Sequence, residues 1–346
     1  MSARKERDRA RVALLHVADR TGVVEFAHSL IGLGFELVAT GPTATALRQA
    51  GAPHKTVSEF VGERLPADAL GLLHPKLIAA ITDDKPKVDL VAVNLYPLSS
   101  ATSDPALTQD EVLAYVDPVG PALLRAAARN FKQVIALCDP DDYQQAIETL
   151  KAYDRMLPDR RQALAAKAFH YSAYYDSTVA QYLGGQWEEF PDEVVIALKK
   201  SADLRYGENP HQAGAFYTLS GARPWGLNAA QLHTGRPLVY GHYLDLETAW
   251  ELVSAFQEPA CAIVKHGVPA GFACGEDLAK AARRAYAGDP RGCFRGTAAV
   301  NAEVDVRAAE FFAEEFVSCI AAPSFSPKAL QLLKAKKDIR LVTLPS

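Results

Sequence analysis

One loop of the chain gathers several groups that could bind a charged ligand. Residues 202–212 read Ala-Asp-Leu-Arg-Tyr-Gly-Glu-Asn-Pro-His-Gln, and Gly207 and Pro210 oppose a continuous helix or strand there. Arg205 offers a planar guanidinium that matches a phosphate or a carboxylate. Tyr206 can stack on a base or donate a hydrogen bond, and Asn209 adds an amide. The sequence therefore predicts a loop that binds a substrate.

A lysine and a histidine stand together further along the chain. Lys265 and His266 follow the apolar run Ala262-Ile263-Val264, which predicts a buried strand, and a Gly/Pro turn is expected at 267–271. At the end of such a strand His266 could act as a general base and Lys265 could stabilise negative charge. The alternative is that the pair only decorates the surface.

A third candidate lies between a predicted strand and a predicted helix. Thr40, Gly41 and Thr43 surround Pro42 there, and backbone N–H groups at a helix N-terminus suit a phosphate. Arg20, after the preceding strand, could be the charge partner. The alternative is a plain helix cap supplied by Thr43.

Two further groups of residues follow predicted strands or border a predicted helix. Asn94 and Tyr96 end an apolar run and could face the same crevice as Thr40, or they could serve only strand-end turn chemistry. Asp117 precedes a predicted helix and could accept a proton or cap that helix. Arg129 ends the helix, where the dipole favours a cation.

These residues need elements to position them, and the apolar periodicity predicts those elements. Strands are expected at 11–17, 35–39, 88–94, 134–138, 194–199, 215–218, 260–265 and 297–300. Helices are expected at 22–33, 44–50, 121–130, 246–256, 276–287 and 307–316, and through 142–183 with a break at Pro158, whereas 41–43 should form a turn. The alternation in the first half predicts an α/β fold with a parallel sheet wrapped by helices.

Composition limits the classes of protein that this chain could represent. It has 346 residues, 49% hydrophobic and 23% charged, so about two domains with real cores are expected. The net charge of −4 argues against general nucleic-acid binding, and no apolar run predicts a membrane span. The five cysteines are scattered without metal-ligand spacing, so we expect no metal and a reducing, cytoplasmic location.

The order of these motifs resembles the bifunctional purine-biosynthesis family that joins AICAR transformylase to IMP cyclohydrolase. The resemblance extends over almost the whole chain through these segments: Asp19–Gly22, Thr40–Thr43, Asn94–Pro97, Asp117–Asn130, Ala166–His170, the Arg205 loop, Lys265-His266, Pro323–Pro327 and Lys336–Leu341. It implies a methylglyoxal-synthase-like parallel α/β domain at 1–186, followed by a single cytidine-deaminase-like α/β subdomain at 187–346, truncated against the family's two.

The resemblance also implies roles for the candidate residues. Lys265, His266, Asp117, Tyr96 and Arg129 would be catalytic. The substrate-binding residues would be Arg205, Tyr206, Asn209, Arg20, Thr40, Gly41, Thr43 and Asn94. The substrate would be AICAR, formyl-AICAR or a close nucleotide analogue, with 10-formyltetrahydrofolate as formyl donor, in a homodimer.

Several positions depart from the family's motifs. Gly71 stands where the family has a lysine before Leu-His-Pro, and Pro42 replaces a glycine of the phosphate loop. Two other hypotheses therefore stand beside the family reactions. One is a diverged paralogue acting on a purine-like nucleotide in a specialised pathway. The other is a non-catalytic subunit that completes a separate transformylase chain.

Overall fold

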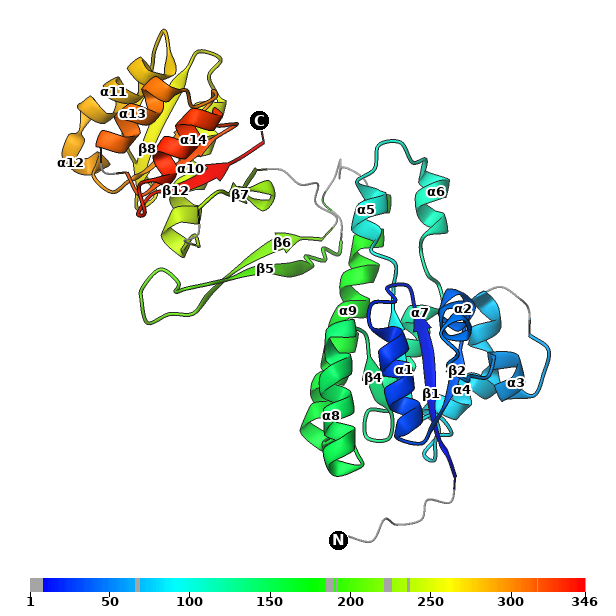
Figure 1. The fold of residues 1–346 in the computed structure, drawn as a ribbon. Coiled ribbons are helices and arrows are strands. Elements are labelled where there is room, and N and C mark those ends of the chain that lie inside the picture. The colour runs from blue at the N-terminus through cyan, green and yellow to red at the C-terminus, as the bar shows by residue number, and fades with distance from the viewer. Residues whose placement is uncertain are drawn as a thin grey trace. The chain divides into compact units, whose positions relative to one another are not determined.

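A computed structural model describes residues 9–65, 69–184, 190, 192–220, 226–234, 237–315 and 317–345. The chain divides into two compact units, Met1–Ala197 and Leu198–Ser346, and each is considered by itself. Both units are α/β, as predicted (Figure 1). Within the described residues, no helix is both long and apolar enough to cross a membrane.

The first unit is built on a four-stranded parallel sheet in the order β2-β1-β3-β4. The strands are β1 (Arg11–Val17), β2 (Phe35–Ala39), β3 (Leu90–Asn94) and β4 (Ile135–Leu137). Its helices are α1 (Val23–Gly32), α2 (Gly41–Gln49), α3 (Val57–Val61), α4 (Pro75–Thr82), α5 (Leu98–Thr102), α6 (Gln109–Ala114), α7 (Gly120–Arg129), α8 (Tyr143–Tyr153) and α9 (Pro158–Gly184), with short 3₁₀ turns at Ala69–Leu73 and Pro140–Asp142.

Alternation along β1 explains why helices cover both faces of this sheet. Leu14 packs in the core formed with α4, α7 and α9, whereas Leu15 packs in the core formed with α1, α2 and α8. Successive side chains of a strand point to opposite faces, so an uninterrupted apolar strand requires cover on both sides. The predicted parallel sheet wrapped by helices is confirmed.

The second unit contains a six-stranded mixed sheet and a separate two-stranded ribbon. The sheet order is β7-β12-β11-β10-β8-β9, and the ribbon pairs β5 with β6. The strands are β5 (Leu198–Leu204), β6 (Gly214–Leu219), β7 (Gln231–Leu232), β8 (Ala260–Lys265), β9 (Val268–Cys274), β10 (Thr297–Val300), β11 (Cys319–Ala322) and β12 (Arg340–Thr343). The helices are α10 (Tyr240–Ser254), α11 (Leu278–Gly288), α12 (Pro290–Cys293), α13 (Val306–Glu314) and α14 (Pro327–Lys334), with a 3₁₀ turn at Gly226–Ala229.

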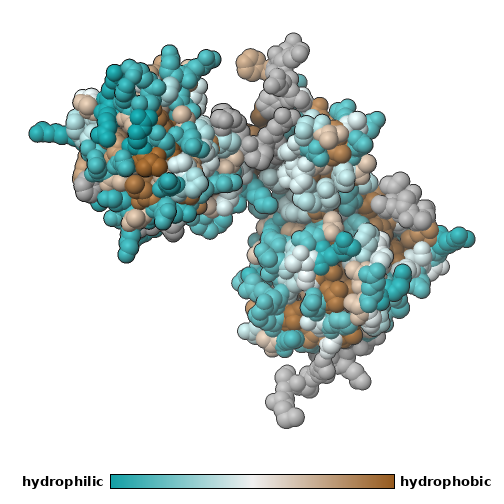
Figure 2. All heavy atoms as spheres, turned by 45° about the horizontal axis from the view of Figure 1, so that its top comes forward, coloured by the Kyte–Doolittle hydropathy of each residue, from teal (hydrophilic) through white to brown (hydrophobic). Residues whose placement is uncertain are grey.

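The two faces of the mixed sheet are also both covered. Ile263 of β8 belongs to the core with α11, α13 and α14, whereas Val264 belongs to the core with α10. On the face drawn in Figure 2, hydrophilic side chains dominate both units and hydrophobic ones form small patches. Large apolar side chains fill the two cores on either side of the sheet.

Three local predictions were wrong. Residues 41–43 form the first turn of α2 rather than a turn before it, because Gly41 adopts a φ of 46° that lets the chain enter the helix directly after β2. The strand expected at 194–199 begins only at Leu198, where pairing with β6 starts. The Gly/Pro segment 267–271 is mostly strand β9, since an edge strand tolerates Pro269.

Candidate functional site

The carboxyl ends of β1, β2 and β3 bring polar residues together at one edge of the first sheet. Val17 of β1 is opposite Asn94 of β3, and Leu15 of β1 is opposite Ala39, the last residue of β2. In an open parallel sheet this edge is where ligands usually bind. The residues that follow each strand are therefore the candidates for a reaction centre.

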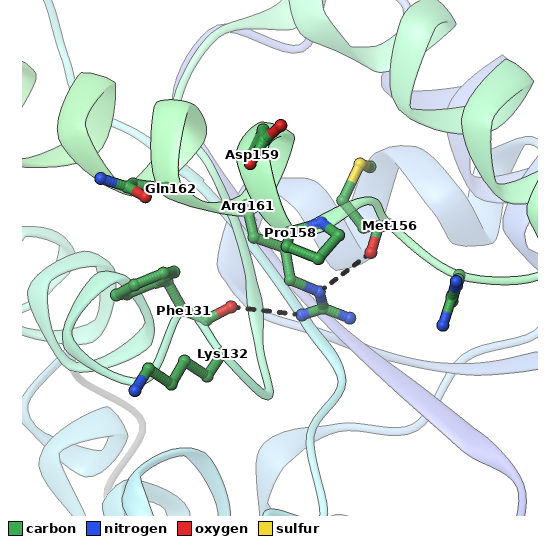
Figure 3. Close-up of a pocket in the computed structure, with 8 residues that line it drawn as sticks. Phe131, Lys132, Met156, Pro158, Asp159, Arg161 and Gln162 are labelled. Atoms are coloured by element: carbon green, nitrogen blue, oxygen red, sulfur yellow. Dashed lines mark hydrogen bonds between the residues drawn. The ribbon is translucent and has the colours of Figure 1, made fainter.

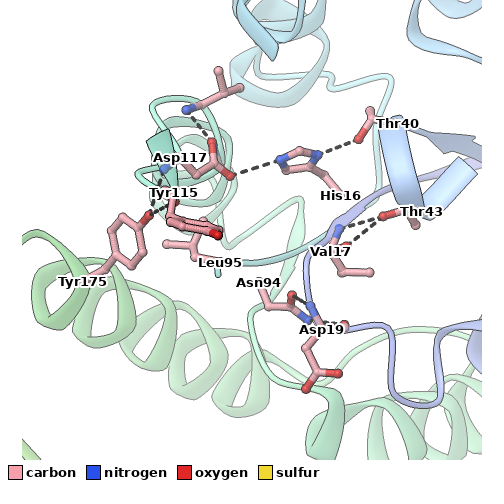
Figure 4. A network of polar contacts seen from close by, with 12 residues as sticks. His16, Val17, Asp19, Thr40, Thr43, Asn94, Leu95, Tyr115, Asp117 and Tyr175 are labelled. Atoms are coloured by element: carbon pink, nitrogen blue, oxygen red, sulfur yellow. Dashed lines mark hydrogen bonds and ion pairs between the residues drawn. The ribbon is translucent and has the colours of Figure 1, made fainter. Parts of the chain in front are cut away.

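His16 links two of the predicted site residues in a chain of hydrogen bonds (Figure 4). Its Nδ1 lies 2.5 Å from Thr40 Oγ1, and its Nε2 lies 3.2 Å from Asp117 Oδ2. With Asp117 ionised, Nε2 carries the proton toward the carboxylate, so neutral His16 accepts from the Thr40 hydroxyl at Nδ1. An imidazole held in one tautomer by a carboxylate can move a proton to or from a substrate.

Asp117 is fixed by the backbone around it. Its Oδ1 accepts hydrogen bonds from Val119 N at 2.8 Å and Gly120 N at 2.9 Å, and its own N–H donates to the Tyr175 hydroxyl at 2.8 Å. Burial raises the pKa of Asp117, but the hydrogen bonds from His16, Gly120 and Val119 outweigh burial and lower the pKa below its ordinary value. The carboxylate is therefore ionised at neutral pH and orients His16.

Gly120 allows Asp117 to approach the start of α7 so closely. A Cβ at this position would lie 2.4 Å from Leu95 Cδ2 and 2.5 Å from Asp117 Oδ2. Both distances are far below van der Waals contact, so only glycine fits without movement. The residue type at 120 thus serves the geometry of the carboxylate.

The start of α2 has the features expected of a phosphate-binding segment. Thr40 is the N-cap, but its side chain makes no capping hydrogen bond and contacts His16 instead. The first-turn N–H groups of a helix have no partner inside the helix, and the dipole makes this end positive. Pro42 removes one of these donors. The remaining N–H groups and the helix dipole still suit this N-terminus to an anion.

Thr43 has a different role from the cap that we considered. It is buried, and its Oγ1 accepts from Val17 N at 3.0 Å and donates to Val17 O at 3.1 Å. These two bonds tie the first turn of α2 to the end of β1. Thr43 consequently positions the phosphate segment from within, and the helix cap is Thr40.

Asn94 also acts on the backbone. Its Oδ1 accepts from Asp19 N and its Nδ2 donates to Asp19 O, both at 2.8 Å. The Asp19 carboxylate accepts from the side chain and the backbone of Thr21, and these bonds lower its pKa. Asn94 therefore orders the loop that carries Arg20, whose side chain is exposed.

An aromatic pair stands beside this cluster. Tyr96 stacks on Tyr115 with ring centroids 4.6 Å apart, and the two side chains are 37% and 40% exposed. Such an exposed, ordered pair of rings can receive a planar base. Arg129 lies at the other end of α7, roughly 14 Å along the helix axis from Gly120 at about 1.5 Å per residue. The structure thus brings Tyr96 to the cluster and leaves Arg129 away from it.

In the second unit, Lys265 and His266 lie at the turn between β8 and β9. His266 and Gly267 have φ values of 56° and 74°, which is the backbone of a tight two-residue hairpin turn and is strained for histidine. Asp245 Oδ1 accepts from Gly267 N at 2.7 Å, and burial raises the pKa of Asp245. Lys265 Nζ donates to Phe294 O at 2.9 Å. The turn therefore presents the exposed imidazole of His266 beside Lys265, whose ammonium group is hydrogen-bonded to a backbone carbonyl.

The Arg205 loop lies at the end of the β5–β6 ribbon (Figure 1). Gly207 N donates to Gln212 O at 2.8 Å, and Asn209 N donates to the Gln212 side chain at 2.8 Å. Within the described residues, no hydrogen bond or ion pair joins this loop to the Lys265–His266 turn. The predicted nucleotide-binding residues of this loop and the Lys265–His266 pair therefore belong to two separate segments.

Sequence reasoning missed three residues of these clusters. His16, Tyr115 and Asp245 were not among the predicted site residues, although His16 interrupts the apolar run that follows Arg11 in β1 and could have been recognised by that. Tyr115 carries no comparable signal. Among the described residues, no group of three or more His, Cys, Asp or Glu could hold a metal ion.

Comparisons with known proteins agree with this architecture. The sequence model of the MGS-like domain matches residues 22–116, and that of the AICARFT/IMPCHase bienzyme matches residues 127–346. The bifunctional purine biosynthesis protein PurH of Anoxybacillus flavithermus is 38% identical over 96% of this chain and 68% of that protein.

Further relatives show the same degree of similarity. The PurH proteins of Myxococcus xanthus and Listeria monocytogenes are 40% and 39% identical over 96% of this chain and over 68% and 69% of their own lengths. The crystal structure of ForH is 31% identical and covers 50% of this chain and 97% of its own, with a TM-score of 0.46. The chain belongs to the AICARFT/IMPCHase bienzyme family, an enzyme family of purine biosynthesis.

Proposed function

We propose that the first unit closes formyl-AICAR, or a close analogue, to IMP. The observation that carries this proposal is the chain Thr40–His16–Asp117 beside the anion-binding start of α2. Thr40, Gly41 and Arg20 would hold the phosphate, Thr43 and Asn94 would keep the surrounding backbone in place, and Tyr96 would stack against the ring. Arg129 would act catalytically only if it moved toward the substrate.

Ring closure needs proton transfers that this cluster can supply. The carboxamide nitrogen forms a bond to the formyl carbon, and the formyl oxygen leaves as water. One proton comes from the carboxamide nitrogen and one from the formamido nitrogen. His16 can take the first at Nδ1 through the Thr40 hydroxyl that donates there and return it to the departing oxygen, while ionised Asp117 stabilises the imidazolium formed in between. The formamido proton goes to the same oxygen, which then leaves as water. Gly71 has no side chain to share this work.

For the second unit we propose AICAR transformylase chemistry with 10-formyltetrahydrofolate as the formyl donor. Lys265 and His266 fit this reaction in kind, because an exposed imidazole can take the amine proton of AICAR and a neighbouring ammonium stabilises negative charge. Arg205, Tyr206 and Asn209 would bind the nucleotide. A division at 1–186 and 187–346, a homodimer and a cytoplasmic location remain predictions that accompany this proposal.

Two parallel assays test the proposal. The purified protein is incubated with formyl-AICAR, and separately with AICAR and 10-formyltetrahydrofolate, and IMP is followed by absorbance and chromatography. IMP in the first assay supports ring closure, and IMP in the second supports both activities. If neither forms IMP, the proposed ring closure is wrong, and if the second assay also yields no formyl-AICAR, the proposed formyl transfer is wrong. Tight binding of AICAR without turnover would then favour a diverged paralogue or a non-catalytic subunit.

A further inference from the structure

A cavity lies in the first unit, away from the His16–Asp117 site. Its volume is about 540 Å³, within the range of small-molecule sites. It is bordered by the turn after α7, the connection between α8 and α9, and the first turn of α9 (Figure 3). Its lining residues are Phe131, Lys132, Arg155, Met156, Pro158, Asp159, Arg161 and Gln162.

The cavity lies at the amino ends of the strands, whereas the proposed reaction centre lies at their carboxyl ends. The turn after α7 leads directly into β4, which begins at Ile135, so the cavity is at the amino end of that strand. The Asp117 carboxylate lies at the other end of α7, where Gly120 begins the helix. A ligand in this cavity would therefore leave the His16–Asp117 site open.

Three cations around the cavity lack an ion-pair partner. Lys132, Arg155 and Arg161 have no carboxylate oxygen within 4.0 Å in the part of the chain that the structure describes. The Arg161 guanidinium is half-buried and donates to two carbonyls, Met156 O at 3.3 Å and Phe131 O at 3.5 Å. Burial lowers the pKa of Arg161 and the Asp89 carboxylate partly offsets this effect, so an anion in the cavity would stabilise the buried guanidinium.

The remaining walls favour a ligand that is more than a bare anion. Phe131 and Pro158 supply an aromatic ring and apolar surface, and Gln162 supplies an amide. The start of the 27-residue helix α9 adds the positive end of a helix dipole to the same wall. Among the described lining residues, three cations face one carboxylate, that of Asp159.

We propose that this cavity binds a phosphate monoester that carries a planar ring, at a site separate from the proposed reaction centre. The cations would hold the phosphate, with Arg161 as a preformed fork whose direction two carbonyls already set. Phe131 would contact the ring. The site goes beyond the proposed function, since it requires neither ring closure nor formyl transfer.

The test uses adenosine 5′-monophosphate as the probe, with ribose 5-phosphate and inorganic phosphate for comparison. Hydrogen–deuterium exchange of the whole chain reports where the probe binds. The proposal requires protection of peptides covering 129–134 and 153–163, stronger with adenosine 5′-monophosphate than with ribose 5-phosphate. Equal protection by ribose 5-phosphate would refute the part that assigns a ring to the ligand, and no protection in these peptides would overturn the site.

A charge-reversal variant tests the cations without disturbing the half-buried Arg161. Lys132→Glu/Arg155→Glu changes two exposed side chains. It should raise the probe concentration that gives half-maximal protection of these peptides at least tenfold. Lys85→Glu/Lys87→Glu makes the same change in charge on exposed residues outside the lining and should leave the affinity within twofold. Unchanged affinity in the first variant, or an equal loss in both, would overturn the assignment.

Discussion

The replacement Asp117→Asn tests the proposed reaction centre most directly. The asparagine has almost the same shape, and its oxygen can still accept from the N–H groups of Val119 and Gly120. Its NH₂ group then faces His16 Nε2, 3.2 Å away in the native arrangement, and donates where the carboxylate accepted. His16 must therefore carry its proton on Nδ1, toward Thr40, and it loses the charge that stabilises its protonated form.

The magnitude of the loss can be worked out from the role assigned to His16. A positioned general acid–base typically contributes about 10²- to 10⁴-fold to a rate. We therefore expect kcat for formyl-AICAR closure to fall at least about 100-fold, which is roughly 2.8 kcal/mol in activation free energy at about 1.4 kcal/mol for each factor of ten. The free energy of unfolding should fall by only about 1 kcal/mol, because the backbone hydrogen bonds remain possible.

A double-mutant cycle separates this mechanism from a loss of structure. His16→Gln should reduce kcat about as much as Asp117→Asn, and the double variant should be scarcely slower than either, since the two residues act as one unit. Asp176→Asn is the control, because this exposed carboxylate pairs with Arg125 at 2.9 Å. A loss in Asp117→Asn below tenfold, or fully additive losses in the cycle, would refute the reasoning.

Three other outcomes are expected. Gly120→Ala should lower the free energy of unfolding, measured by chemical denaturation, by about 1–3 kcal/mol, because the new Cβ would overlap Leu95. The control Gly32→Ala, whose Cβ would meet nothing within 4 Å, should change it by less than about 1 kcal/mol. Equal effects of the two replacements would contradict the argument from close packing. Burial lowers the pKa of His242 to about 4, so the unfolded chain takes up a proton at a higher pH than the folded one. The free energy of unfolding of the second unit should therefore be highest above pH 6.5 and fall by up to about 3 kcal/mol as the pH is lowered toward 4. His242→Gln should remove this pH dependence, and an unchanged pH profile in that variant would contradict the assignment. Tyr115→Ala should raise KM for formyl-AICAR severalfold with little change in kcat, and a loss confined to kcat would argue against ring stacking.

Much of the fold could be predicted because its signals are local. The strands at 11–17, 35–39, 260–265 and 297–300 have the predicted bounds, since each is an apolar run between turn residues. The start of α2 was mispredicted because glycine at position 41 reads as a turn signal, and its positive φ can either end a loop or open a helix, depending on how the next residues pack. The candidate site was predicted in part: Thr40 and Asp117 were chosen for their positions, but nothing in their spacing pointed to the histidine between them.

The sequence by itself determined the family, the α/β class and the strands whose ends carry the polar residues, because periodicity, turn chemistry and motif order are written along the chain. Only the tertiary structure decided which of those residues meet. His16 and Asp117 are 101 positions apart, and they become neighbours because β1 pairs with β3 and α7 packs against that sheet. The same packing leaves Arg129 at the far end of α7. A contact of this kind depends on the spatial order of the strands in the sheet, and no local pattern of residues encodes that order.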